Sequence, residues 1–365
     1  GSPMKGSPMK GSPMKGSPLR VGYVSADFGD HPVGHLVRGV FGRHDRARVQ
    51  VFCYALTPSD GTAHRRQVEN DADVFTDVSS MDDAAVAALI RSQGVQVLVD
   101  LMGYTKRGRM HIFGMRPAPL QVSFMGWPAS TSAPFIDYIL VDRVVAPPHL
   151  VPALFSEKVV YLPGSYYVND YAQSARGAVR VDAARVRREE GLPAPGEGVV
   201  LCVFNQHYKI DPEVFAVWAN VLRRVPGSVL WLLDWGGHAV PSLRAELEAA
   251  GVPPGRAVFS PLRPKDDHLA RAGAADLFLD TLLYGGHTSA ADALWTGVPL
   301  VTAPGEKMAT RVAAGLAAAL GEPGMAVGSL RDYEDTVVSF GRDPASLGAL
   351  RSRVEALREV PGGLF

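Results

Sequence analysis

A lysine stands where an apolar run meets a helix start, a position suited to binding an anion. Lys209 closes the segment 204–209, which continues the strand-like run 199–204, and Asp211 and Pro212 have the residue types of a helix N-cap and first turn. A cation beside the unpaired amides of a helix start suits a phosphate. The alternative is a solvated lysine that flanks Asp211.

A pair of glycines precedes a second helix start. Gly285 and Gly286 allow close backbone approach to a ligand, and Thr288 and Ser289 are residue types that cap a helix and leave its amides pointing outward. These amides would form a second anion site, and Asp292, one turn further on, would accept hydrogen bonds from ribose hydroxyls. An ordinary capped helix has the same pattern, so this motif needs support from others.

Two segments that carry histidines also follow predicted strands. Lys265 and His268 come after the run 257–260, where they would contact a base and a ribose, or would simply form a charged helix start. His31 and His35 come after the first predicted strand, where a histidine would accept a proton from an attacking hydroxyl. The alternative for these two histidines is a hydrogen bond to the backbone at the helix start.

The sequence carries only a weak signal for a metal. Asp71 and Asp73 form the Asp-x-Asp pair that some metal-dependent sugar transferases use, but the pair follows a helical stretch and not a clear strand. The ten histidines show no spacing typical of metal ligands. We therefore predict no metal-binding residues.

Short apolar runs alternate with helical patterns, which is typical of a parallel sheet with helices on both faces. The strands predicted in the first half are 20–25, 49–56, 95–101, 120–124, 137–141 and 158–162. Those predicted in the second half are 199–204, 228–233, 257–260, 276–280 and 299–302. Open sheets of this kind bind ligands at the carboxyl ends of their strands, where the segments described above lie.

A change in composition divides the chain. Residues 173–198 are rich in Ala, Arg, Pro and Gly, so we place a linker there, between an N-terminal lobe at 19–172 and a C-terminal lobe at 199–365. Residues 1–18 contain three copies of Gly-Ser-Pro-Met-Lys, which predicts a disordered tail. The predicted fold class is α/β, with two facing Rossmann-like domains and a cleft between them.

The overall composition excludes several classes of protein. The 365 residues are 47% hydrophobic and 20% charged, a globular mixture, and 37 basic residues balance 37 acidic ones. A net charge of zero argues against binding nucleic acid or an anionic membrane by bulk charge. The two cysteines, Cys53 and Cys202, are too few for a disulfide framework or a structural zinc site, so a reducing, intracellular setting is expected. No apolar run approaches the roughly 20 residues of a membrane span.

The motifs together resemble one family. From Leu19 to about Leu350 the chain is similar to the catalytic region of the O-linked N-acetylglucosamine transferases. The matching stretches are Leu19-Arg-Val-Gly-Tyr-Val-Ser-Ala-Asp-Phe-Gly-Asp-His-Pro, Val51-Phe-Cys-Tyr-Ala-Leu, Gly103-Tyr-Thr-Lys, Arg116-Pro-Ala-Pro, Ser156-Glu-Lys, Phe204-Asn-Gln-His-Tyr-Lys-Ile-Asp-Pro, Ser228-Val-Leu-Trp-Leu-Leu, Gly286-His-Thr-Ser and Ala293-Leu-Trp-Thr-Gly-Val-Pro.

The resemblance implies a glycosyltransferase of the two-lobed GT-B type. Such an enzyme inverts the sugar, uses no metal or cofactor, and moves N-acetylglucosamine from UDP-N-acetylglucosamine to serine and threonine hydroxyls of cytoplasmic or nucleocytoplasmic proteins. The N-terminal lobe would lie on the acceptor side, and the C-terminal lobe would bind the nucleotide sugar. We also expect the last helix to pack back on the N-terminal lobe.

The resemblance also implies roles for particular residues. Lys209 would neutralise the leaving diphosphate, and His287 would lie beside it. His31 matches a histidine that acts as base or substrate positioner, and Asp100 matches a carboxylate that assists proton transfer. The residues that would hold UDP are Gln206, Lys265, His268, Thr288, Ser289 and Asp292.

Two alternatives stay open beside this interpretation. Plant relatives of the SPINDLY type use GDP-fucose and resemble Phe-Asn-Asn-x-x-Lys and Gly-Thr-Thr-Thr at the nucleotide loops, whereas this chain has Gln206 and His287 there. A non-catalytic UDP-binding module is the alternative of a different class. We see no tetratricopeptide repeats, which usually precede the catalytic region in the family, and relatives continue past the position of Phe365. Tyr104 stands where many bacterial relatives have histidine.

Overall fold

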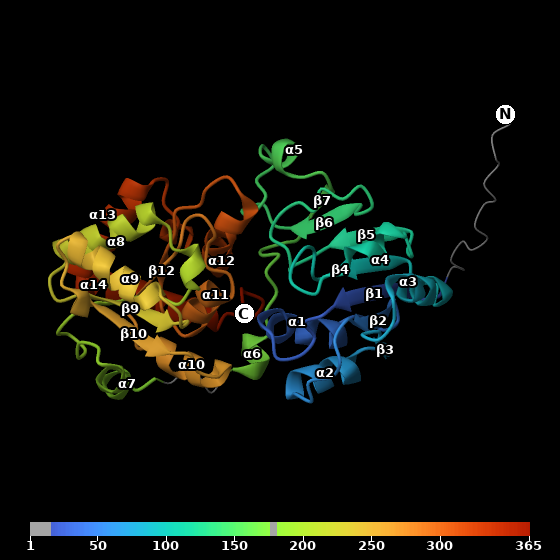
Figure 1. Cartoon of the computed structure of the whole chain (residues 1–365), viewed down its shortest axis with the longest axis horizontal. Helices are drawn as coiled ribbons and strands as arrows, with labels where there is room; N and C mark the ends of the chain where they lie inside the picture. The colour runs from blue at the N-terminus through green and yellow to red at the C-terminus, as the bar shows by residue number, and fades with distance from the viewer. Residues whose placement is uncertain (1–15, 176–180) are drawn as a thin grey trace.

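Two parallel sheets form the frame of the molecule. The computed structural model describes residues 16–175 and 181–365, which fold into two α/β domains that lie side by side (Figure 1). The first sheet has the strand order β3-β2-β1-β4-β5-β6-β7, and the second has the order β10-β9-β8-β11-β12. All strand pairs formed by the described residues are parallel. The predicted α/β fold class is therefore confirmed.

The first domain surrounds the seven-stranded sheet. Its strands are β1 (Leu19–Ser25), β2 (Val49–Ala55), β3 (Val74–Asp77), β4 (Val97–Asp100), β5 (Leu120–Ser123), β6 (Tyr138–Val141) and β7 (Lys158–Tyr161). Its helices are α1 (Pro32–Gly42), α2 (Ala63–Asp71), α3 (Asp83–Ser92), α4 (Met110–Gly114), α5 (Val151–Leu154) and α6 (Tyr171–Ser174). Both faces of this sheet are covered, because Tyr23 and Val24 are neighbours on β1 and are buried in different apolar clusters.

The second domain surrounds the five-stranded sheet. Its strands are β8 (Val200–Val203), β9 (Val229–Asp234), β10 (Ala257–Pro261), β11 (Leu277–Leu279) and β12 (Leu300–Val301). Its helices are α7 (Ala183–Glu190), α8 (Pro212–Arg224), α9 (Ala239–Ala249), α10 (Lys265–Ala272), α11 (Thr288–Trp295), α12 (Val312–Leu320), α13 (Leu330–Arg342) and α14 (Pro344–Arg358). All four residues of β8 are buried, as expected for a central parallel strand.

The Asp-x-Asp pair lies between α2 and β3, a short strand that the sequence analysis missed. Asp71 is the last residue of α2. Asp73 accepts a hydrogen bond from the Val51 amide at 2.6 Å and pairs with Arg46 at 2.5 Å. The carboxylate of Asp73 thus ties β2 to the loop that leads into β3, and this pair serves the packing of the first sheet.

The predicted linker 173–198 contains the helix α7, which belongs to the second domain. Arg187 of α7 is buried, donates a hydrogen bond to the Ala274 carbonyl at 2.9 Å and pairs with Asp276 at 2.6 Å. The helix α7 was not predicted from the sequence, because charged residues dominate it and few of its positions face the core. Residues 176–180 of the predicted linker and residues 1–15 of the predicted tail lie outside the described part of the chain.

The chain end returns to the first domain, but not through its last helix. The helix α14 packs against α11, α12 and α13 of its own domain. Beyond it, the Leu364 carbonyl accepts a hydrogen bond from Asn169 at 2.8 Å, and the Phe365 ring meets the Tyr171 ring edge-on at 5.6 Å. Figure 1 shows the C-terminus between the two domains, near α6 and α1.

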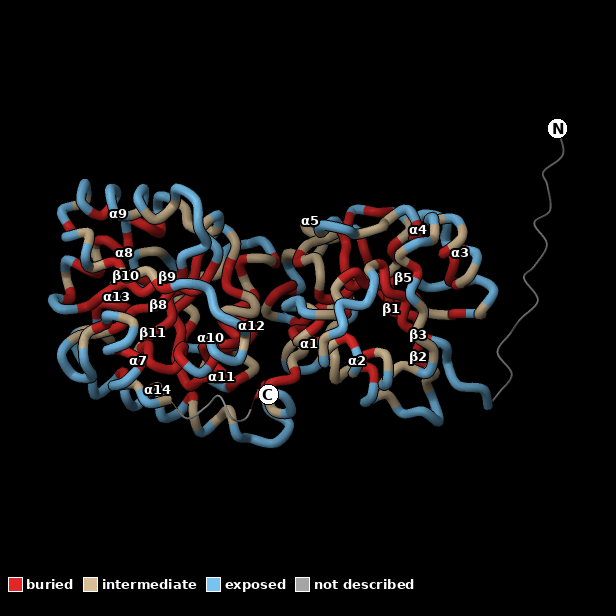
Figure 2. The backbone as a smooth tube through the Cα atoms, turned by 60° about the horizontal axis from the view of Figure 1, so that its bottom comes forward, coloured by how far each residue is buried: buried red, intermediate tan, exposed pale blue. Residues whose placement is uncertain are grey.

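One apolar cluster extends through both domains. It contains Tyr23 and Val122 of the first sheet, Tyr167 between the sheets, and Cys202 and Trp231 of the second sheet. Figure 2 shows the buried backbone along the strands of both domains. No helix among the described residues has both the length and the apolar composition needed to cross a membrane.

Candidate functional site

A cavity of about 360 Å³ opens at the carboxyl ends of the strands of the second sheet. The loops after β8, β9, β10 and β11 line it, and the first domain contributes Pro32 and His35 from α1. Eight of the residues predicted from the sequence share this cavity: Gln206, Lys209, Lys265, His268, His287, Thr288, Ser289 and Asp292. The structure therefore brings together residues that are as much as 86 positions apart in the sequence, in the position that an open α/β sheet uses for ligands.

Lys209 lies in a short 3₁₀ turn directly after β8, with its amine turned toward the glycine pair. Its Nζ donates a hydrogen bond to the Gly285 carbonyl at 2.9 Å and lies 4.2 Å from the centre of the Tyr284 ring. Burial lowers the pKa of Lys209 to about 8, while the nearby Asp280 carboxylate acts in the opposite direction. Because an ammonium group has three donors, Lys209 keeps donors for an anion in the cavity.

Asp280, which was not predicted from the sequence, fixes the backbone of the glycine pair by hydrogen bonds. Its buried carboxylate accepts hydrogen bonds from the Gly286 amide at 2.5 Å, the Thr281 amide at 2.9 Å and the Thr302 hydroxyl at 2.7 Å. Burial raises the pKa of Asp280 to about 6. A Cβ added to Gly286 would lie 3.1 Å from Asp280 Oδ1, so the backbone of this loop needs glycine for its close approach.

The start of α11 faces the cavity, with His287 as its N-cap residue. The His287 side chain makes no capping hydrogen bond, and Thr288 and Ser289 are the first helical residues and not the cap. Their hydroxyls turn to neighbours instead: Thr288 meets the Tyr167 hydroxyl at 2.8 Å, and Ser289 donates to Asn205. The first amides of α11 thus remain suited to an anion, as the sequence analysis expected.

The imidazole of His287 is held in its neutral form. It stacks on Tyr284, with ring centroids 5.0 Å apart, and its Nε2 lies 3.1 Å from the Ala309 carbonyl. Burial, with the charge of Lys209 second, lowers the pKa of His287 to about 3. At neutral pH this side chain is a hydrogen-bonding group and not a cation.

Asp292 is tied to the segment between the domains. Its Oδ1 accepts hydrogen bonds from the Tyr171 hydroxyl and from Lys265 Nζ. Tyr171 comes from α6, and its ring stacks on Trp295 with centroids 5.6 Å apart. Tyr171 was not predicted from the sequence, because only tertiary packing brings α6 beside α11.

His268 has a buried nitrogen that the protein does not satisfy. The described residues provide no hydrogen-bond partner for its Nδ1. Its ring meets the Phe204 ring edge-on at 5.0 Å, and burial lowers its pKa to about 4. Because buried polar atoms in folded proteins are nearly all paired, an unpaired nitrogen on a cavity wall is a natural contact for a ligand.

The structure places His31 and Asp100, predicted for proton transfer, outside this cavity. His31 caps α1, with its Nδ1 3.3 Å from the Val33 amide, and lines a second cavity of about 700 Å³ at the edge of the first sheet. Asp100 ends β4, where its carboxylate accepts hydrogen bonds from the Met102 and Gly103 amides, both at 2.9 Å. Burial raises the pKa of Asp100 to about 6.

His35, four residues after His31, is the first-domain histidine at the main cavity. Burial lowers its pKa to about 4, and its Nε2 lies 2.8 Å from the Asp30 carboxylate. The structure also places His64 beside His35, with ring centroids 4.2 Å apart. The sequence spacing gave no sign of this grouping, because it depends on the packing of α1 against α2.

This architecture, with two facing parallel-sheet domains and a cavity between them, defines the GT-B class of glycosyltransferases. The sequence model of glycosyl transferase family 41 matches residues 7–186 and 179–365. The chain therefore belongs to glycosyl transferase family 41, and its resemblance to the O-linked N-acetylglucosamine transferases is confirmed.

Relatives with curated names support this placement. The chain is 44% identical over 340 residues to the probable UDP-N-acetylglucosamine–peptide N-acetylglucosaminyltransferase SEC of Arabidopsis thaliana. This match covers 93% of the chain and 34% of that protein. It is 32% identical to the Caenorhabditis elegans UDP-N-acetylglucosamine–peptide N-acetylglucosaminyltransferase, covering 92% of the chain and 38% of that protein. It is 30% identical to a protein from Solanum lycopersicum with the same probable activity, named SPINDLY, and the match covers 93% of the chain and 36% of that protein. The chain thus spans little more than a third of these relatives.

Solved structures show the same fold. A mutant of the Thermobaculum terrenum O-GlcNAc transferase matches with a TM-score of 0.86 at 30% identity, covering 98% of this chain and 66% of that one. Anabaena HepE in complex with UDP matches with a TM-score of 0.57 at 13% identity, covering 94% of each chain. The second likeness is in fold alone.

Proposed function

We propose that this chain carries the donor site of a protein O-GlcNAc transferase, which moves N-acetylglucosamine from UDP-N-acetylglucosamine to serine and threonine hydroxyls of proteins. The observation that carries the proposal is Lys209, whose partly buried amine donates to the Gly285 carbonyl on the wall of the cavity that the start of α11 also lines. The names of the relatives point to the same donor and to peptide acceptors.

The proposed reaction is a single displacement with inversion. The acceptor hydroxyl oxygen forms a bond to the anomeric carbon while the bond from that carbon to the β-phosphate oxygen breaks, and its electron pair stays on UDP. Negative charge therefore grows on the diphosphate, where Lys209 and the amides of α11 would stabilise it in a protected site. These groups would supply the positive charge for departure, so the proposal needs no metal or cofactor for this step.

The hydroxyl proton has no acceptor assigned by the geometry. Neither His31 nor Asp100 lines the cavity, so the geometry gives no support to the roles in proton transfer that were predicted for them. The hydroxyl proton would pass to water as the new C–O bond forms, and because it leaves late in the displacement, the step needs no strong base. His35 is the first-domain histidine that lines the cavity, and we assign it no part in the proton transfer.

The acceptors that we propose are proteins of a reducing compartment, cytoplasmic or nucleocytoplasmic. Support comes from Cys53 and Cys202, which are both buried free thiols. The balanced charge of the chain gives no support for nucleic acid as a partner.

Calorimetric titration with UDP and with GDP tests the donor site. We expect UDP to bind more tightly than GDP, and Lys209→Ala to weaken UDP binding, whereas Lys307→Ala, an exposed lysine outside the cavity, should not. A preference for GDP would favour fucosyl transfer instead. Binding of neither nucleotide would contradict the proposed donor site.

Sugar transfer to a serine peptide tests the catalytic part. We expect Lys209→Ala to lower kcat by roughly 100- to 1,000-fold, the loss typical when a group that stabilises transition-state charge is removed. The circular dichroism spectrum should be unchanged. Tight UDP binding without any transfer by the unmodified chain would instead identify a non-catalytic module.

A further inference from the structure

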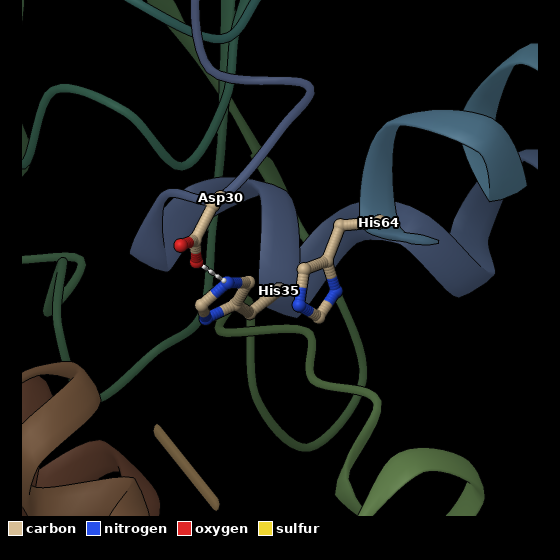
Figure 3. Close-up of side chains that lie close together, drawn as sticks. All are labelled: Asp30, His35 and His64. Carbon is tan, nitrogen blue, oxygen red and sulfur yellow. Dashed lines mark hydrogen bonds and ion pairs between the residues drawn. The ribbon is translucent and has the colours of Figure 1, made fainter. Parts of the chain in front are cut away.

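The starts of α1 and α2 bring three potential metal ligands together. Asp30 lies just before α1, His35 lies in the first turn of α1, and His64 lies in the first turn of α2. One ligand atom of each lies within 4.8 Å of the others. Figure 3 shows the rings of His35 and His64 side by side, with the Asp30 carboxylate turned toward His35.

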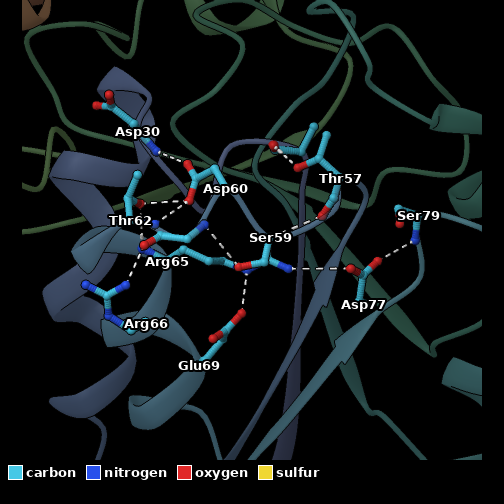
Figure 4. A network of polar contacts seen from close by, with 12 residues as sticks. Asp30, Thr57, Ser59, Asp60, Thr62, Arg65, Arg66, Glu69, Asp77 and Ser79 are labelled. Carbon is cyan, nitrogen blue, oxygen red and sulfur yellow. Dashed lines mark hydrogen bonds and ion pairs between the residues drawn. The ribbon is translucent and has the colours of Figure 1, made fainter.

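The three side chains are held on one hydrogen-bonded frame. The Asp60 carboxylate accepts a hydrogen bond from the Asp30 amide at 2.7 Å, which fixes the loop before α1. The same carboxylate accepts from the Thr62 amide at 3.0 Å and its hydroxyl at 2.8 Å, and Thr62 caps α2. Figure 4 shows this network. Because Asp60 holds both helix starts, the separation of His64 from Asp30 is set by the fold.

The donor set favours a transition-metal cation. Two imidazoles and one carboxylate form a ligand set that divalent ions such as Zn²⁺ prefer, and three protein ligands leave a coordination position open. Burial, and after it the guanidinium of Arg38, lower the pKa of His64, while the carboxylates of Asp30, Asp266 and Asp60 act in the opposite direction. Asp30 Oδ1 and His35 Nε2 are already 2.8 Å apart, close to the separation of two ligands on one ion.

Arg38 defines how the metal-free site is arranged. Its Nη1 lies 2.5 Å from His64 Nδ1, and its Nε donates to the Asp170 carboxylate at 2.8 Å. Because arginine only donates, His64 Nδ1 accepts and the proton is on Nε2. An ion on His64 Nε2 would move this proton to Nδ1. Because two donors would then face each other, Arg38 would turn away from His64 while it stays paired with Asp170.

We propose that Asp30, His35 and His64 bind one divalent transition-metal ion, with Zn²⁺ as the representative. The site is separate from the groups assigned to the leaving diphosphate, which are Lys209 and the start of α11. His35 belongs to both regions, so a bound ion would fix its ring on the wall of the nucleotide cavity.

Calorimetric titration of the chelator-treated full chain with Zn²⁺ tests the site. We expect one ion per chain, and we expect His64→Gln and Asp30→Asn each to weaken binding at least about 100-fold, since loss of even an outer-shell partner costs about 10- to 100-fold. His111→Gln is the matched control, because His111 lies 3.6 Å from the Asp83 carboxylate but has no second histidine beside it. Co²⁺ in place of Zn²⁺ should give visible absorption bands of a nitrogen- and oxygen-ligated ion, lost in His64→Gln.

Two outcomes would overturn the proposal. One is equal Zn²⁺ affinity in the chain and in both ligand variants, and the other is weak binding that His111→Gln reduces as much as His64→Gln does. UDP titration of the same samples shows that each variant is folded, because neither His64 nor Asp30 lines the nucleotide cavity.

Discussion

The pKa of the Lys209 amine lies within the pH range of ordinary assays. Its pKa is lowered to about 8 by burial, so the free site loses its ammonium charge as pH rises through that value. In the proposed donor site the diphosphate would bind the charged form, so binding above pH 8 would take up a proton. The histidines of the cavity, with pKa values of about 3 for His287 and about 4 for His268, are neutral throughout this range.

The expected pH dependence follows from this linkage. UDP affinity should be constant from pH 7 to near pH 8, then fall with a slope approaching about tenfold per pH unit. Calorimetry from pH 7 to 9.5 measures it. Lys209→Met should bind more weakly but without a slope, and a slope of equal size in that variant would assign the proton to another group.

The sequence predicted those site residues that stand in loops directly after strands. Lys209 and His287 are of this kind, because the carboxyl ends of parallel strands meet at one sheet edge, and Asp292 follows in the helix that His287 caps. Asp280 and Tyr171 were missed. Their importance comes from what they touch, the glycine pair and Asp292, and no local pattern encodes such contacts.

Among the elements, the loop from β11 to α11 depends most on backbone space. A methyl group at Gly286 would lie 3.1 Å from Asp280 Oδ1, the Phe278 ring and Ser289 Oγ. Gly286→Ala should therefore shift the loop, lowering the free energy of unfolding by about 1–3 kcal/mol, as overpacking does. The shift should also weaken UDP binding.

Urea denaturation and UDP titration measure these two effects. Gly324→Ala is the matched control, because a Cβ there meets no atom within 4 Å and its φ is not positive. If both alanine variants have the stability and affinity of the unmodified chain, the loop is not tightly constrained and its role as a rigid cradle is wrong.

Strong apolar runs made most strands predictable from the sequence, whereas short or charged elements could not be predicted. The buried strand β8 is an uninterrupted apolar segment. In contrast, β3 has only four residues, none of them fully buried, and α7 presents a surface of arginine and glutamate. Edge strands and polar helices gain their structure from neighbours, so sequence patterns describe them poorly.

At the scale of the whole molecule, Tyr171 of α6 links the end of the first domain to the proposed nucleotide cavity. Its hydroxyl donates to Asp292, and its ring packs between Trp295 and the terminal Phe365. Tyr171→Phe keeps the ring contacts and removes the hydrogen bond. We expect UDP affinity to fall by about 1 kcal/mol, roughly fivefold, with little change in Tm.

A conservative control separates this effect from a general loss of a hydroxyl. Tyr161→Phe removes a hydrogen bond to the Ala146 carbonyl within the first domain and should leave UDP affinity unchanged. Equal UDP affinity in both phenylalanine variants would show that Tyr171 does not position Asp292. The two-domain plan was predictable from the sequence, but this contact between its parts was not.

The apolar cluster that extends through both sheets has a consequence for how the protein melts. Separate cores would unfold in separate steps, but Tyr23 of one sheet and Trp231 of the other belong to the same cluster, which also contains Tyr167. Differential scanning calorimetry should therefore record a single heat-absorption peak, with a calorimetric enthalpy equal to the van't Hoff enthalpy. Two resolved peaks would mean that each sheet keeps its own cooperative unit. With one peak, a destabilising change in either domain lowers the melting temperature of the whole chain.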